Sequence, residues 1–153
     1  MTLAVEGYKD ALECLRDQQL AQSLYDEGAV IMADVLLVLH GAEHRARRLL
    51  ELKVFRRDFF RYYEQEVFPA TLRQTMAPFV AAGRADLGDF GYRVTLNLTA
   101  DFAGIDRPRR STEETEHLRA LVMSFSEGAT LVHSTRNKDE VRAEVREALR
   151  DFE

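Results

Sequence analysis

Apolar residues recur at intervals of three and four along nearly the whole chain, which is the spacing of an amphipathic α-helix. The clearest stripe consists of Leu87, Phe90, Val94, Leu98 and Phe102, which we expect on one helical face. No segment shows a convincing alternation of apolar and polar residues, the pattern of a β-strand. The spacing therefore predicts an all-α fold of about six helices.

Turn and capping residues divide this pattern into separate helices. We expect helices at residues 8–25, 42–55, 57–82, 86–104, 111–125 and 139–152. Pro69 and Pro78 each remove a backbone donor, which predicts a kink or break at one of them. Gly83 is an expected C-cap, and the segment from Ser111 to Glu114 has the spacing of a capping box.

Composition excludes several classes of protein. A length of 153 residues suits one unit, residues 1–153, and the 46% hydrophobic content is that of a globular chain. The longest apolar run, Val35 to Leu39, is far too short to cross a membrane. A net charge of −5 disfavours nucleic acid as a partner. Cys14 is the only cysteine and no secretory signal is visible, so we expect a cytoplasmic protein.

A histidine and an arginine form the strongest candidate site. His44 and Arg48 are four residues apart, so they lie on one face of the expected helix. An imidazole and a guanidinium presented together can hydrogen bond a carboxylate or a phosphate, which arginine grips with two N–H groups. The alternative is a basic face that is solvated or paired with acids such as Glu43 and Glu51. Taken alone, the two residues favour that second interpretation.

Two short patterns suggest a metal site instead. His40 to His44 matches the H-x-x-E-H order of some zinc enzymes, but Gly41 separates the histidines and we expect the helix to begin after it. Glu114 and His117 supply one Glu-x-x-His string, whereas di-iron bundles need two. A metal-binding bundle that uses His40, His44 and Glu114 to His117 is therefore a minor alternative.

The segment from Asp34 to Arg48 resembles the start of the C helix in bacterial cytochromes P-450. The family's Gly-x-x-His-x-x-x-Arg phrase is matched by Gly41, His44 and Arg48. Weaker phrases follow the family's order along essentially the whole chain, and the strength of the resemblance lies in that order. They fall at residues 8–17 (B helix), 54–57 (C-helix exit), 82–87 (between D and E), 100–105 (E-helix end), from 111 (F) and from 139 (start of G).

The resemblance implies a particular fold and function. The fold would be the B to G helix region of a haem-thiolate monooxygenase, which is incomplete. In the family, the residues that correspond to His44 and Arg48 bind the propionates of haem b. The complete enzyme would oxidise a small apolar molecule with O₂ and electrons from a redoxin or reductase. Residues 28–39 and 125–132 would face that substrate.

The residues that operate the iron in this family are missing. There is no F-x-x-G-x-x-x-C-x-G phrase, Cys14 lies in the B-helix segment, and the acid–threonine pair that activates oxygen is absent. The E-x-x-R strings fall in the wrong helices, starting at Glu13, Glu116 and Glu147. We therefore expect the chain to be inactive alone, to bind haem unstably, and to pair with a missing C-terminal half.

A protein of another class is the main alternative. The chain would then be a helical binding or scaffold protein that descends from such an enzyme and associates with itself through its apolar faces.

Overall fold

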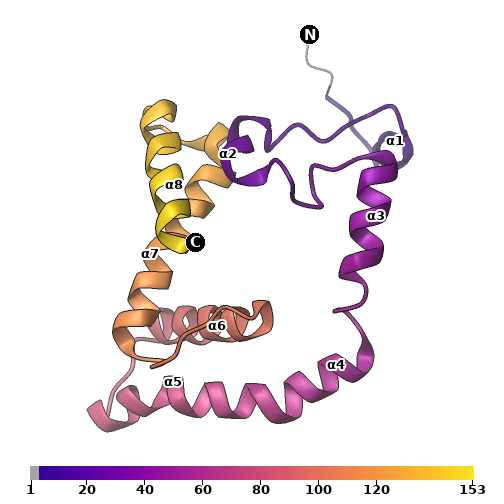
Figure 1. The fold of residues 1–153 in the computed structure, drawn as a ribbon. Helices are drawn as coiled ribbons and strands as arrows, with labels where there is room; N and C mark the ends of the chain where they lie inside the picture. The colour runs from indigo at the N-terminus through magenta and orange to yellow at the C-terminus, as the bar shows by residue number, and fades with distance from the viewer. Residues whose placement is uncertain (1–3) are drawn as a thin grey trace.

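The computed structural model describes residues 4–153, and every regular element among them is helical (Figure 1). The α-helices are α1 (Tyr8–Arg16), α2 (Ala29–Met32), α3 (Gly41–Glu51), α4 (Arg57–Tyr62), α5 (Phe68–Ala82), α6 (Leu87–Ala103), α7 (Thr112–Ala129) and α8 (Lys138–Phe152). Shorter turns are η1 (Asp26–Gly28), η2 (Tyr63–Val67) and η3 (Leu131–His133). The predicted all-α class is confirmed. Within residues 4–153, no helix combines the length and apolarity that a membrane crossing requires.

The predicted caps are confirmed. The Ser111 hydroxyl accepts a hydrogen bond from the Glu114 N–H, and the Glu114 carboxylate accepts one from the Ser111 N–H, so the capping box is complete. Gly83 ends α5 with a φ of 65°, a left-handed conformation that glycine adopts without steric cost. Asn137 caps α8 by accepting hydrogen bonds from the N–H groups of Asp139 and Glu140.

The first predicted helix is wrong at its end. α1 stops at Arg16 instead of reaching residue 25, and Leu20 and Leu24 lie outside it. The Asp17 carboxylate accepts a hydrogen bond from the Gln19 N–H at 2.9 Å. An aspartate side chain that bonds to nearby backbone competes with helix formation in this way, so the chain turns at Asp17.

The third predicted helix is interrupted near the first of its two prolines. The π-helical turn η2 separates α4 from α5 and directly precedes Phe68 and Pro69. Pro69 has no N–H to donate to the carbonyl four residues earlier, and a locally widened turn accommodates that loss. Pro78 lies inside α5 without ending it.

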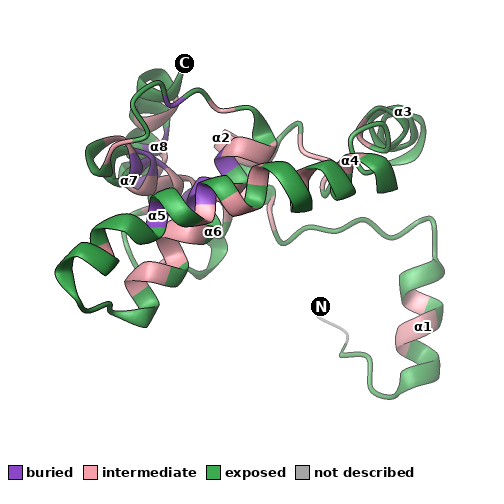
Figure 2. Cartoon of the chain, turned by 90° about the horizontal axis from the view of Figure 1, so that it is seen from below, coloured by how far each residue is buried: buried purple, intermediate pink, exposed green. Residues whose placement is uncertain are grey.

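Six of the seven buried apolar residues within residues 4–153 form two small clusters instead of one core. Leu96 and Ala100 of α6 meet Leu118 of α7 in the first. Leu131, Val141 and Val145 form the second, where η3 packs against α8. Figure 2 shows that burial is concentrated in α5 to α8, and neither α1 nor α3 contains a buried residue.

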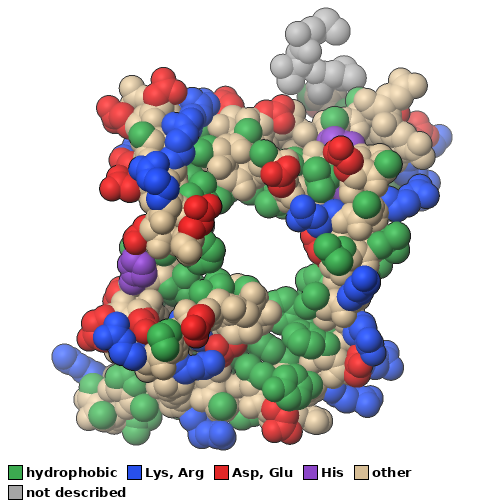
Figure 3. All heavy atoms as spheres, in the orientation of Figure 1, with side chains coloured by type: hydrophobic (Ala, Val, Ile, Leu, Met, Phe, Trp, Pro, Cys, Tyr) green, Lys and Arg blue, Asp and Glu red, His purple; other side chains and the backbone are tan. Residues whose placement is uncertain are grey.

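The helices surround an opening instead of filling the centre of the molecule (Figure 1). Figure 3 shows this opening in the space-filling view, with hydrophobic side chains along much of its rim. The accessible surface is 11606 Å² for a chain of 17.5 kDa, whereas a compact monomer of that mass exposes about 7,900 Å². The chain therefore exposes roughly half as much surface again as a self-contained domain.

Two glycines let α2, α7 and α8 approach closely. A Cβ atom on Gly28 would collide with the carbonyl oxygen of Gly128 and lie 2.8 Å from that of Ala129. A Cβ atom on Gly128 would lie 2.6 Å from Cγ2 of Val145. Non-bonded atoms do not approach so closely, so glycine at position 28 lets η1 pack on α7, and glycine at position 128 lets α7 pack on Val145 of α8.

Replacement of Gly28 tests this contact. We expect Gly28→Ala to lower the free energy of unfolding by about 1–3 kcal/mol, because the methyl group meets backbone that must shift. Urea unfolding followed by circular dichroism measures the change. Gly91→Ala is the matched control: Gly91 is exposed within α6 and its Cβ would meet nothing within 4 Å. That change should raise stability by up to about 1 kcal/mol. Equal effects of the two substitutions would contradict the close approach.

Candidate functional site

α3 carries the predicted His44 and Arg48. The helix begins at Gly41, one residue earlier than expected, so both side chains lie within it and one turn apart. Both residues are exposed. Neither side chain has a hydrogen-bond or ion-pair partner within residues 4–153. The structure thus presents the pair as unoccupied N–H donors on one helical face.

The structure does not assemble the predicted metal alternative. His40 precedes α3 with an extended backbone, φ −131° and ψ 161°, so it does not lie on a helical face with His44. α7, which carries Glu114 and His117, lies across the opening from α3 (Figure 1). Residues 4–153 contain no group of three or more histidine, cysteine or acidic side chains that could hold a metal ion.

The two segments predicted to face a substrate lie against each other. Val30 and Ile31 of α2 pack with Phe125 of α7 on the cluster around Leu131. Leu131 is completely buried, so part of the segment 125–132 is core and not a free surface.

Five aromatic rings join the end of α3 to α6. The Phe102 ring centroid lies 5.5 to 5.8 Å from those of Phe55, Phe59 and Tyr63, and 6.3 Å from that of Phe60. Phe55 is 52% exposed and Phe60 is 44% exposed. This aromatic cluster connects α3 to the rest of the molecule and leaves an aromatic surface uncovered.

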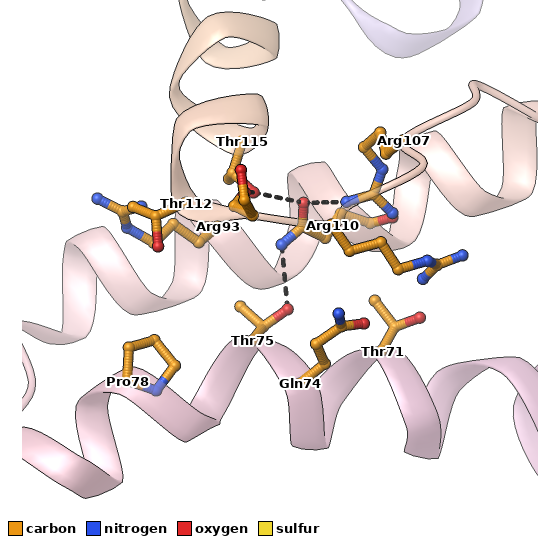
Figure 4. Close-up of a pocket in the computed structure, with 11 residues that line it drawn as sticks. Thr71, Gln74, Thr75, Pro78, Arg93, Arg107, Arg110, Thr112 and Thr115 are labelled. Atoms are coloured by element: carbon orange, nitrogen blue, oxygen red, sulfur yellow. Dashed lines mark hydrogen bonds between the residues drawn. The ribbon is translucent and has the colours of Figure 1, made fainter.

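A buried polar network, which the helical periodicity does not predict, connects α5, α6 and the loop before α7 (Figure 4). Arg107 and Asp101 form an ion pair at 2.6 Å, and each side chain is only 5% exposed. Arg110 Nη2 adds a second guanidinium contact to Asp101 at 2.8 Å, and the Thr71 hydroxyl donates to the same carboxylate. Burial acts to raise the pKa of Asp101, but the hydrogen bonds from Thr71, Arg110 and Arg107 outweigh it and hold that pKa below its usual value.

Asn97 joins the three helices of this network. Its amide nitrogen donates to the Thr75 hydroxyl of α5 at 3.0 Å, and its amide oxygen accepts from the Thr115 hydroxyl of α7 at 3.2 Å. Arg107 donates to the same oxygen and, at 3.0 Å, to the Asn97 carbonyl. Within residues 4–153, Arg107 Nε is the only buried side-chain nitrogen or oxygen without a partner. Because buried polar groups need partners, these bonds hold α5, α6 and α7 in one arrangement.

One sequence signal could have located the network. Asn97 directly follows Leu96 and lies one turn before Asp101, so two polar residues interrupt a largely apolar helix. Thr71 and Thr75 are also four residues apart and share a face of α5. Polar residues at buried helical positions predict partners on neighbouring helices.

A polar cavity of about 210 Å³ lies beside the network, between α5 and the first turn of α7 (Figure 4). Three arginines contribute to its lining and no carboxylate does. The hydroxyl-bearing residues of that lining include Thr71, Thr75 and Thr115. This cavity lies beside buried, charged side chains, and it is distinct from the face of α3.

No family model, curated protein or solved structure matches the chain. Its function is therefore inferred from its residues and their geometry.

Removal of the Asp101 charge tests the network. We expect Asp101→Asn to lower the free energy of unfolding by about 3–5 kcal/mol, because it leaves the Arg107 charge buried without a counter-ion. The pH dependence has a definite sign, since the folded-state pKa of Asp101 is lowered. The stabilisation by the Asp101 carboxylate is fully present above its unfolded-state pKa of about 3.9, and it is lost as the pH falls through the lower folded-state pKa. Urea titrations at several pH values measure both effects.

Asp58→Asn is the matched control for this experiment. Asp58 pairs with Arg56 at 2.6 Å, but both side chains are more than 60% exposed. Water screens such a pair, so its loss should change stability little. Similar destabilisation by the two substitutions would refute a structural role for the buried network.

Proposed function

We propose that the chain is the propionate-binding N-terminal part of a haem-dependent monooxygenase of the cytochrome P-450 type, which needs further protein to be active. One observation carries the proposal: His44 and Arg48 lie one turn apart on an exposed helix and have no side-chain partners within residues 4–153. The chain has 26 acidic residues, so acids that could pair with this face are plentiful. Because the face of α3 with His44 and Arg48 is nevertheless unpaired within residues 4–153, it suits a ligand that contains carboxylates.

The donor chemistry of α3 fits the acid groups of haem. An imidazole N–H and a guanidinium fork are both donors, and one helical turn separates them, as two neighbouring carboxylates require. Haem with an axial thiolate would supply the activation of oxygen. Cys14 lies on α1, outside the family's thiolate phrase, so we assign the axial ligand to a segment beyond this chain. His44 and Arg48 would bind and orient the cofactor and would not touch the iron.

The uncovered surface supports the need for further protein. The chain exposes about 3,700 Å² more than a compact monomer of its mass, and a standard protein interface buries about 800 Å² on each partner. Part of the excess is aromatic and adjoins α3, at Phe55 and Phe60. An apolar substrate, a redoxin or reductase as electron donor, and a cytoplasmic location belong to the same proposal.

The same surface favours a second candidate function, a binding or scaffold protein that associates with itself. Exposed apolar side chains are then covered by other copies of the chain. Analytical ultracentrifugation separates the two proposals: a stable, haem-free oligomer supports the scaffold, and a monomer that binds a complementary segment supports the enzyme part.

The enzyme proposal is tested by co-expression with the coding sequence downstream of Glu153. We expect that sequence to encode the E-x-x-R and cysteine segments, and the combined protein to retain haem and to give the carbon monoxide difference spectrum of a thiolate-ligated ferrous haem. His44→Ala or Arg48→Ala should weaken haem retention about ten- to hundredfold, since a hydrogen bond to a charged group contributes about 1.5–3 kcal/mol. Haem transfer to apomyoglobin measures retention.

Arg47→Ala is the matched control, because Arg47 has the same charge and lies on the same helix but about 100° around the axis from Arg48. It should leave retention unchanged. Downstream sequence that lacks a cysteine segment, or equal haem loss in the Arg47 and Arg48 variants, would overturn the proposal.

A further inference from the structure

The buried network contains more positive than negative charge. Arg107 and Arg110 both pair with the single carboxylate of Asp101, and neither has another acidic partner within residues 4–153. Arg107 is buried, so water does not fully compensate for its charge. Asp101 neutralises the buried Arg107, so the remaining unit of positive charge is that of Arg110, whose side chain is 43% exposed and lines the cavity.

Arg110 adopts an unusual backbone conformation at this place. Its φ of 49° is the only positive φ of a non-glycine residue within residues 4–153. Such a conformation costs on the order of 1–3 kcal/mol and is concentrated at ligand-binding sites. Here it follows a turn in which the Arg110 N–H donates to the Arg107 carbonyl at 3.2 Å. The side chain then extends over α5 beside the cavity (Figure 4).

The cavity has the size and the donors of an anion site. Its volume of about 210 Å³ exceeds the share of one water molecule, about 30 Å³, several times. In Figure 4, Thr71, Thr75 and Gln74 of α5 point toward the loop that carries Arg107 and Arg110. The lining therefore combines guanidinium, hydroxyl and amide groups and contains no carboxylate, although the Asp101 carboxylate contacts Thr71, Arg107 and Arg110 of that lining.

We propose that this cavity binds a small oxyanion of phosphate size, with Arg110 as the principal ligand. Arginine binds phosphate through its N–H groups. Both Nη atoms of Arg110 already contact Asp101, so the anion would share this guanidinium with the carboxylate, and the Thr75 hydroxyl, which accepts from Asn97, would donate to the anion. The anion would neutralise the charge that Asp101 leaves uncompensated. This anion site involves neither haem nor the face of α3, so the result of the phosphate experiment does not bear on the proposed function.

Thermal unfolding and isothermal titration calorimetry of the full chain with inorganic phosphate test the proposal, with sodium chloride at equal ionic strength as the reference. A ligand that binds only the folded state raises the melting temperature saturably. We expect such saturation at low millimolar phosphate, and at least tenfold weaker binding by Arg110→Gln. Arg110→Gly relieves the positive φ but removes the contact with Asp101, so it should remain folded, as circular dichroism checks, and fail to bind.

Arg109→Gln is the matched control, because it removes the same charge one residue away. The Arg109 side chain is 79% exposed, and its one ion-pair partner among residues 4–153 is Glu114, at 3.4 Å, so phosphate affinity should be unchanged. Glycerol phosphate is titrated in parallel. Tighter binding of glycerol phosphate indicates that the ligand is a phosphorylated metabolite, and tighter binding of inorganic phosphate indicates that it is the free ion. Absence of saturable binding of both, or undiminished affinity in both Arg110 variants, overturns the proposal.

Discussion

The ion pair between Asp101 and Arg107 is the interaction on which the packing of α5, α6 and the start of α7 depends. Only seven apolar residues are buried within residues 4–153, and six of them are divided between two separate clusters. Hydrophobic burial of this extent cannot by itself fix three long helices. The carboxylate and guanidinium, together with Asn97, connect α5, α6 and the start of α7 through bonds that have direction. Each unmade bond would leave a buried polar group without a partner, so alternative packings are disfavoured.

The sequence predicts the parts of the fold that local rules govern. The stripe from Leu87 to Phe102 predicts α6, and the Ser111 box predicts the start of α7, because periodicity and capping act within a few residues. The predicted end of the first helix was wrong because the Asp17 side chain accepts a hydrogen bond from backbone beyond α1. The burial of Arg107 was not predicted either, since it depends on Asn97 and Asp101 arriving from another helix. His44 and Arg48 lie where the helical spacing places them, and their ligand stays a prediction.

Rigidity is distributed unevenly as a result. The network and the clusters hold α5 to α8, and the glycine contact between Gly28 and Gly128 attaches α2 to that unit. α3 has no comparable support, since it contains no buried residue. Its position relative to α6 is determined mainly by rings that follow it in sequence, above all Phe55 against Phe102. Elements with few buried contacts open most easily, so α3 should be among the least stable helices.

This unevenness bears on how a site on α3 would work. His44 and Arg48 bind a pair of carboxylates tightly only when α3 is already fixed in position. If α3 is mobile, ligand binding must also order the helix, and that ordering costs free energy. The aromatic cluster fixes one end of α3 and exposes Phe55 and Phe60 beside it. A planar apolar ligand or a further segment that covered these rings would immobilise α3 by the same contacts. On the proposed function, the covering of the aromatic surface and the ordering of His44 and Arg48 are therefore one event, in which apolar burial supplies the free energy and the two N–H donors supply the orientation.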